Sequence, residues 1–147
     1  MLPEAIELII VTPVRELLRE TVSEVQLPGA DGYLGVLPGA APLITELGIG
    51  ELTYHSKNGG AESEPMAIIR GFAEVLPDRV TVLAETAELA AEIDVARAEA
   101  ALKRAQERMA SNAPDLDWDR VTVALQRALI RIQVARKQRA APMVVSN

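Results

Sequence analysis

Cysteine is absent from the 147-residue chain, and histidine occurs once, at His55. The lack of cysteine excludes disulfides, thiolate nucleophiles and cysteine-based metal sites. A single histidine excludes a His-based catalytic triad or a metal centre built on several histidines from this chain alone. Aromatic residues make up only 3% of the chain, so the predicted core is aliphatic. We therefore expect no catalytic residues and no metal site, and we interpret His55 as a solvent-facing residue of a strand or turn.

Long apolar runs and targeting segments are also lacking. No run approaches the roughly 20 residues that a membrane-spanning helix needs. The N-terminus, Met1-Leu2-Pro3-Glu4, has no basic or apolar signal region and is acidic, unlike a mitochondrial transit peptide. A phosphate-cradling Gly-x-x-x-x-Gly-Lys-Ser/Thr loop is missing as well. These absences predict a protein of a cytoplasm-like compartment that reaches a membrane only through a partner.

Charge is distributed unevenly along the chain, whose formal net charge is -6. Acidic residues predominate up to Ala84, whereas no acidic residue follows Asp119. The basic residues beyond that point are Arg120, Arg127, Arg131, Arg136, Lys137 and Arg139. Such asymmetry usually reports a partner, and here it predicts an acidic partner for the C-terminal end.

The residues up to Ala84 have the pattern of short β-strands. Apolar and polar residues alternate with the period of a half-buried strand, and glycine and proline separate the runs. Hairpin signals lie at Lys57-Asn58-Gly59-Gly60 and Pro77-Asp78. The pattern predicts an antiparallel sandwich or barrel. Its expected strands are Ile6–Thr12, Val22–Leu27, Tyr33–Leu37, Glu51–Tyr54, Met66–Ile69, Phe72–Leu76 and Arg79–Leu83.

The composition changes to that of helices near Thr86, which is the predicted cap of a first helix reaching Met109. A second helix is expected from about Trp118 to Arg136, capped by Asp115 or Asp117. The predicted apolar faces are Leu89, Ile93, Ala96, Ala100 and Ala105 on the first helix, and Val121, Ala124, Leu125, Ala128, Leu129, Ile132 and Ala135 on the second. A short proline-containing turn between them predicts an αα-hairpin. Its alanine-rich seam buries little apolar area, so we expect a marginal hairpin that can open.

The chain is thus predicted to have an α+β fold in three parts. Residues 1–85 form an N-terminal antiparallel β-sandwich, residues 86–139 form the two-helix hairpin, and residues 140–147 form a flexible tail.

Arginines recur at matched spacing on both predicted helices. The two sets, separated by seven and four residues, are Arg97, Arg104 and Arg108, and Arg120, Arg127 and Arg131. Each set falls along one helical face. Two interpretations stay open: solvated faces that pair with nearby glutamates, or an anion site or acidic-partner surface. Arginine suits the second because its planar fork binds two phosphate oxygens at once.

Two segments resemble the F-type ATP synthase epsilon subunit family of bacteria and chloroplasts. They are residues 27–43, LPGADGYLGVLPGAAPL, and residues 71–84, GFAEVLPDRVTVLA. The resemblance extends over nearly the whole chain, and it implies a β-sandwich followed by two helices. It also implies a non-catalytic rotor subunit of the central stalk in a proton- or sodium-translocating synthase. Such a subunit lies peripherally on the cytoplasmic face of the bacterial inner membrane or, as the second choice, on the plastid thylakoid.

The resemblance further implies partners for the β-domain, which in this family binds gamma and sits on the c-ring. Asp31, Gly32 and Tyr33 match the family's ring-contact loop. The family usually has Gly-His-Ala-Pro where this chain has Gly39-Ala40-Ala41-Pro42, so any role of that histidine is inapplicable here.

In this family the hairpin regulates ATP hydrolysis. It can extend along gamma, where basic residues meet an acidic segment of the catalytic beta subunits of the alpha/beta head. Arg120, Arg127, Arg131 and Arg136 are the matching residues here.

Some members bind ATP in the folded hairpin through an Ile/Leu-Asp-x-x-Arg-Ala motif, which Ile93, Asp94, Arg97 and Ala98 match. Glu88, Arg104, Arg120, Arg127 and Arg131 also fall where ATP-binding members place contacting or supporting polar residues, with Glu88 and Asp94 toward adenine and the arginines toward phosphates. ATP is therefore expected as a regulatory ligand, and no cofactor is required. The alternative is that Asp94 and Arg97 only cap and stiffen the first helix.

Three functions other than a rotor subunit are to be compared with the sequence. A stand-alone ATP-binding sensor would bind ATP tightly and have no gamma partner. A nucleic-acid module is disfavoured by the acidic β-domain and the scarcity of aromatics. A hydrolase would need a nucleophile and base, and no recognisable pair is present.

Overall fold

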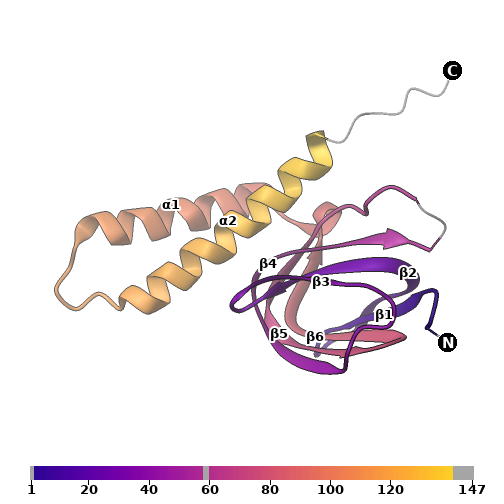
Figure 1. The fold of residues 1–147 in the computed structure, drawn as a ribbon. Coiled ribbons are helices and arrows are strands. Elements are labelled where there is room, and N and C mark those ends of the chain that lie inside the picture. The colour runs from indigo at the N-terminus through magenta and orange to yellow at the C-terminus, as the bar shows by residue number, and fades with distance from the viewer. Residues whose placement is uncertain (1, 58–59, 141–147) are drawn as a thin grey trace, which may run out of the picture.

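The β-domain is a sheet that closes on itself. The computed structural model describes residues 2–57 and 60–140. The strands in these residues are Ile6–Val11 (β1), Glu16–Gly29 (β2), Gly32–Val36 (β3), Leu43–Ser56 (β4), Met66–Leu76 (β5) and Arg79–Leu89 (β6). The strand order is β1-β6-β5-β4-β2-β3, and β1 also pairs with β2. The long, bent strands β2 and β4 therefore run through both layers of a sandwich (Figure 1).

The expected sandwich and both expected hairpin connections are confirmed. β4 pairs with β5 and β5 pairs with β6, all antiparallel. Asn58 and Gly59 of the first connection lie outside the described residues. One pair departs from the all-antiparallel prediction, since β1 runs parallel to β6. That pair and the antiparallel β1–β2 pair together close the sheet, which leaves β1 without a free edge.

The core of the sandwich is aliphatic, as the scarcity of aromatics predicts. Its fully buried members are Val, Leu and Ile side chains such as Ile6, Leu8, Val25 and Leu52. The aromatic side chains of Tyr33, Phe72 and Trp118 are about half exposed instead. The fourth aromatic residue, Tyr54, is half-buried and packs against the core.

The helical part begins later than predicted. Residues 86–89 continue β6 because they pair with Ile69–Met66 of β5, so the expected cap at Thr86 is wrong. A short 3-10 turn, Ala90–Glu92 (η1), precedes helix Val95–Ser111 (α1). The α1 cap is Asp94, whose Oδ1 accepts a hydrogen bond from the Arg97 N–H at 3.0 Å. Helix Trp118–Ala140 (α2) follows, and Asp117 caps it by accepting from the Arg120 N–H at 3.1 Å.

The buried faces of the helices differ in part from the predicted stripes. On α1 the buried residues are Ala98 and Ala105, whereas Ala96 and Ala100 are exposed. On α2 the Leu129 side chain is 46% exposed, although Ile130 and Val134 are buried. The reason is that α2 packs against α1 on one side and against the sheet on another, so its apolar surface is wider than a single stripe.

The hairpin docks on the β-domain mainly through α2. A second apolar cluster joins Ala67 and Ile69 of β5 to Ile130, Val134 and Ala135 of α2, with Ala90 and Ile93 beside them. The turn between α1 and α2 points away from the sheet (Figure 1). Among the described residues, neither helix is both long enough and apolar enough to cross a membrane. Of the predicted tail, residues 141–147 lie outside the described residues.

Candidate functional site

A polar hollow of about 410 Å³ lies where β6, η1, α1 and α2 meet; we call it the hairpin hollow. Six of the predicted site residues line it, namely Glu88, Asp94, Arg97, Ala98, Arg104 and Arg131, together with Glu92 and Ala101. The end of β6 supplies Glu88, and the first turns of α1 supply Asp94, Arg97 and Ala98. The chain thus brings together residues that are widely separated in the sequence.

The carboxylates of the hairpin hollow already have partners within the protein. Glu88 Oε1 accepts a hydrogen bond from Arg131 Nε at 2.7 Å, which makes an ion pair between β6 and α2. Asp94 caps α1, and Glu92 pairs with Arg15 while accepting a hydrogen bond from the Leu89 N–H. The Glu88–Arg131 pair uses one guanidinium nitrogen, so the other two nitrogens of Arg131 remain for a ligand.

The remaining arginines of the hairpin hollow have no such partners. Neither Arg97 nor Arg104 forms an ion pair with a carboxylate of the described residues. Both therefore present guanidinium groups whose donors are available, the chemistry that binds phosphate. The predicted Ile93 is only 8% exposed and packs in the apolar cluster that docks the hairpin, and it does not line the hairpin hollow.

Arg127 lies in a different place from the one that its motif position suggests. It lines a second hollow of about 380 Å³, the arginine hollow, with Arg70, Asp119, Arg120, Val123 and Ala124. Its Nε atom is buried and has no hydrogen-bond partner among the described residues. The family resemblance grouped Arg127 with Arg131 at the predicted ATP site, and the two lie about one turn apart on α2. In the structure the two arginines line different hollows, Arg131 the hairpin hollow and Arg127 the arginine hollow.

Arg70 was not predicted as a site residue, and its backbone is unusual. Its φ is +58° and that of Gly71 is +137°. A left-handed conformation costs a non-glycine residue roughly 1–2 kcal/mol. At Gly71 only glycine fits, because an added Cβ would lie 2.1 Å from the Leu83 carbonyl oxygen. Arg-Gly within a strand pattern is the weak sequence signal of such an irregularity.

Among the residues that the structure describes, Glu51 of β4 is the charged residue that is buried. It was not predicted as a site residue from the sequence. It is 7% exposed. Its carboxylate accepts hydrogen bonds from Gln133 Nε2 at 2.7 Å and Lys137 Nζ at 2.6 Å, and both donors belong to α2. Its own N–H donates to the Tyr33 hydroxyl at 3.1 Å. Glu51 therefore holds the C-terminal half of α2 on the sheet.

The remaining predicted residues lie outside both hollows. Asp31 lies in the exposed turn between β2 and β3, Gly32 begins β3, and Tyr33 beside it is 57% exposed. Arg120 lines the arginine hollow, whereas Arg136 lines an apolar hollow of about 430 Å³ with Leu129 and Ile132. When the hairpin is docked, the four arginines expected to meet an acidic partner therefore line three different hollows.

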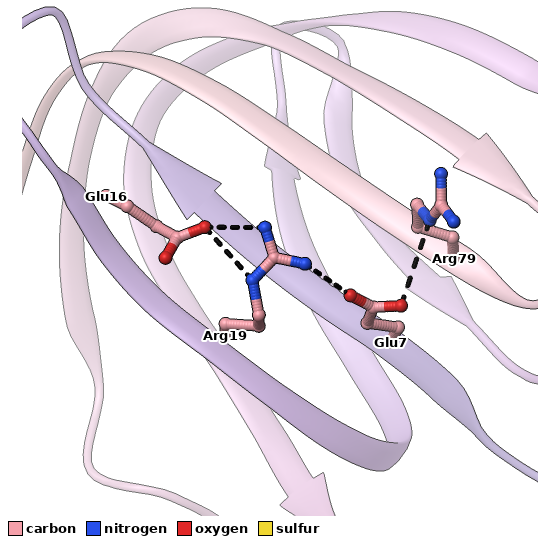
Figure 2. Close-up of polar contacts among 4 residues, drawn as sticks. All are labelled: Glu7, Glu16, Arg19 and Arg79. Carbon is pink, nitrogen blue, oxygen red and sulfur yellow. Dashed lines mark hydrogen bonds and ion pairs between the residues drawn. The ribbon is translucent and has the colours of Figure 1, made fainter.

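A charge network over β1, β2 and β6 has a structural explanation. Figure 2 shows Arg19 between two carboxylates, with Nη1 at 2.6 Å from Glu7 Oε1 and Nη2 at 2.7 Å from Glu16 Oε1. Arg79 Nε lies 4.0 Å from Glu7 Oε2. The hydrogen bond to Glu16 is the largest cause of the raised pKa of Arg19. Because these side chains belong to β1, β2 and β6, they link the strands that close the sheet, although exposed pairs of this kind stabilise it only weakly.

Comparison with protein families identifies two matching domains. The model of the ATP synthase delta/epsilon chain β-sandwich domain matches residues 5–90. The model of the delta/epsilon chain long α-helix domain matches residues 91–136. Both matches follow the observed change from strands to helices after Leu89.

Curated relatives carry the same description. The ATP synthase epsilon chain of Solibacter usitatus is 48% identical over 137 residues, which cover 93% of this chain and 100% of that protein. The ATP synthase epsilon chain of Koribacter versatilis is 50% identical over 112 residues, 76% and 77% of the two chains. A chain of the Euglena gracilis mitochondrial ATP synthase superposes with a TM-score of 0.68 at 24% identity, covering 96% of this chain and 83% of that one. At that identity the superposition shows the fold alone.

Proposed function

The chain belongs to the ATP synthase delta/epsilon family, and from that premise we propose that it is a non-catalytic rotor subunit of the central stalk. In this proposal its β-domain couples the c-ring to gamma, and its hairpin regulates ATP hydrolysis. The chain would then lie peripherally on the cytoplasmic face of the bacterial membrane, held there by the complex.

An exposed apolar patch on the β-domain supports its role in binding a partner. Ile44 of β4, Phe72 of β5 and Leu83 of β6 are 73%, 55% and 54% exposed. Phe72 is paired in register with Leu83 and with Glu46, two residues from Ile44, so the three side chains lie on neighbouring strands. Contiguous exposed apolar surface usually marks a protein interface. We assign gamma to this patch and the c-ring to the Asp31–Gly32–Tyr33 turn.

The hairpin hollow supports ATP as the regulatory ligand. Its volume of about 410 Å³ is within the range of roughly 300–1,000 Å³ that is usual for small-ligand sites. It offers carboxylates at one end of α1 and guanidinium groups along α1 and α2. Asp94 caps the helix and also lines the hollow, so capping and ligand binding are compatible roles.

The location of the hollow carries the regulatory proposal. It is built from both the β-domain and the hairpin, so a ligand there binds the docked conformation and loses its site when the hairpin opens. A ligand shifts an equilibrium by its difference in affinity for the two states. ATP would therefore hold the hairpin down, and low ATP would release it.

Release of the hairpin would also change the charges that it displays. Arg131 would lose its ion pair with Glu88, and Lys137 would lose its ion pair with Glu51, whereas both carboxylates would stay on the sheet. The freed helix then presents Arg120, Arg127, Arg131 and Arg136 with no acidic residue after Asp119. Such a helix would dock on an acidic segment of the catalytic beta subunits and hinder rotation.

Calorimetric titration of the whole chain with ATP tests the nucleotide site. We expect binding that is weakened by Arg104→Gln and retained in Arg136→Gln, a matched loss of charge outside the hairpin hollow. Binding that is equal in wild type and Arg104→Gln would contradict the assignment. Capture of the gamma subunit by the same chain separates a rotor subunit from a stand-alone ATP sensor, which would bind ATP and leave gamma unbound.

A further inference from the structure

A groove of about 900 Å³ follows the seam between the β-domain and α2; we call it the seam groove. The residues of α2 that line it are Gln126, Leu129, Ile130 and Gln133. Because residues three and four apart are neighbours on a helix, these four share one face of α2. On the β-domain side, glycines such as Gly29, Gly48 and Gly50 supply much of the lining. A helix face and a stretch of sheet with few side chains therefore border the groove.

The strands themselves require glycine at two of these positions. A Cβ atom at Gly50 would lie 2.7 Å from the Cβ of Pro28 and 2.9 Å from the hydroxyl oxygen of Tyr33. A Cβ atom at Gly29 would lie 2.6 Å from the carbonyl oxygen of Gly32. These approaches are shorter than the van der Waals contact of about 3.5–4.0 Å. The β-domain therefore cannot fill this surface with its own side chains, which leaves room for a bulky group of another molecule.

Phe72 joins the seam groove to the apolar patch of the β-domain. It lines the groove, and it is also the member of the Ile44–Phe72–Leu83 patch that lies on the middle strand, β5. On the helix side of the same groove, Leu129 is 46% exposed. The exposed apolar surface thus continues from the sheet onto α2, and continuous surface of this kind marks a protein interface. A protein bound to the patch would reach the docked helix as well.

The charges of the seam groove favour a basic partner. Glu46 and Glu85 line it together with one basic residue, Arg70, and both glutamates are exposed. Neither carboxylate forms an ion pair within the part of the chain that the structure describes. The groove is therefore negative, and the whole chain has a formal net charge of -6. Exposed carboxylates beside an apolar interface steer a basic surface toward it.

From these observations we propose that one partner, the gamma subunit, covers the apolar patch and the seam groove together. A bulky apolar side chain of gamma packs against Phe72 and Leu129, and a basic residue faces Glu46 and Glu85. In this arrangement α2 supplies part of the gamma-binding surface. The inference rests on the proposed function, which assigns gamma to the patch, and it adds the docked hairpin to that interface.

A surface shared by the sheet and α2 links gamma binding to hairpin docking. The helical part of the surface is in place only when the hairpin is docked, so gamma binds the docked state more tightly than the open one. By linkage, bound gamma favours the docked hairpin by the same factor. This coupling needs no nucleotide, so it acts beside any effect of ATP.

The affinity of the full chain for the isolated gamma subunit tests the proposal. Leu129→Gln removes the apolar contact of α2, and it should weaken gamma binding about tenfold. Trp118→Gln is the matched control, because Trp118 also belongs to α2 and is 47% exposed but does not line the groove. It should bind gamma like wild type. Equal affinity of wild type and Leu129→Gln, or an equal loss in both variants, would overturn the shared surface.

The role of docking and the role of charge each have an arm of the same experiment. Lys137→Met favours the open hairpin because it removes the ion pair with Glu51, so it should weaken gamma binding. Stronger binding in this variant would assign Leu129 to an extended hairpin and overturn the proposal. The double variant Glu46→Gln, Glu85→Gln should bind more weakly and with less dependence on salt. An unchanged salt dependence would remove the charge argument and contradict the basic partner.

Two further measurements separate this inference from the proposed function. Loss of gamma binding in Phe72→Gln beside wild-type affinity in Leu129→Gln would keep gamma on the patch and overturn the seam groove alone. Gamma that does not bind the wild-type chain would refute the proposed function itself. Sedimentation of the chain alone should show a monomer. A dimer that Leu129→Gln abolishes would assign the groove to a second copy of this chain instead of gamma.

Discussion

The contact between Glu51 and α2 gives the sharpest test of how the hairpin is held down. Lys137→Met keeps most of the apolar stem and removes the ammonium group that lies 2.6 Å from Glu51 Oε2. The buried carboxylate then keeps Gln133 as its α2 donor. Because the lost contact exists only in the docked state, the substitution should shift the docking equilibrium and leave the β-domain intact.

The magnitude follows from the burial of the two partners. Loss of one partner from a fully buried pair costs about 3–5 kcal/mol, whereas an exposed pair contributes about 0–1 kcal/mol. The Glu51 side chain is 9% exposed and that of Lys137 is 53% exposed, so this pair lies between the two limits. We expect a loss of about 1.5 kcal/mol, which is roughly a tenfold rise in the open population.

Hydrogen exchange of α2 amides measures this population, since local opening exposes them to solvent. Lys137→Met should accelerate exchange in α2 about tenfold and leave the core of β1 and β6 unchanged. Arg136→Met is the matched control, because Arg136 is adjacent and has no ion pair among the described residues. Exchange in α2 that stays at the wild-type rate in Lys137→Met, or rises equally in Arg136→Met, would refute the reasoning.

Three other predictions concern the fold. Burial, with the Glu20 carboxylate adding to it, raises the pKa of Tyr54 from 10.0 to about 12. The absorbance of the Tyr54 phenolate should therefore appear near pH 12, and Glu20→Gln should lower this pKa. The free energy of unfolding should fall between pH 10 and 12, because the unfolded state loses the tyrosine proton first. Arg70→Gly should raise the free energy of unfolding by about 1 kcal/mol in denaturant titrations, since it removes the left-handed strain, and a destabilised variant would contradict this. Ala105→Leu should destabilise the helical seam by about 1–3 kcal/mol because Ala105 is 2% exposed, whereas Ala96→Leu, at an exposed position, should be nearly neutral.

Every strand of the β-domain was predicted at least in part, because the signal is local, but the first halves of β2 and β4 were missed and β5 was predicted as two strands, separated at Arg70 and Gly71. Alternating polarity and the turn residues between runs fix which segments are extended. The end of β6 could not be read in this way, because Thr86 to Leu89 have the composition of a helix start. Their pairing with Met66–Ile69 is a tertiary contact, and such contacts override propensity.

The candidate site shows the same division between local and tertiary information. The family resemblance grouped Asp94, Arg97 and Ala98 with Glu88, Arg104 and Arg131, and all six line the hairpin hollow, where Glu88 and Arg131 meet across 43 residues. Helical periodicity placed Arg127 on the face of Arg131, but it cannot show that the sheet beside Arg127 carries Arg70. Glu51 was missed because a glutamate in a strand usually faces solvent, and only the docked α2 covers it.

We propose above all that this subunit regulates its complex through a hairpin that ATP holds on the β-domain. The chain lacks cysteine, so spin labels can be attached at Thr21→Cys on β2 and Glu107→Cys on α1, both exposed positions. The distance between the labels, measured in the reconstituted synthase over a range of ATP concentrations, tests the claim most directly. We predict a growing population at the short, docked distance as ATP rises, together with a rising rate of ATP hydrolysis. One distance distribution at every ATP concentration, with the subunit bound to the complex, would contradict it.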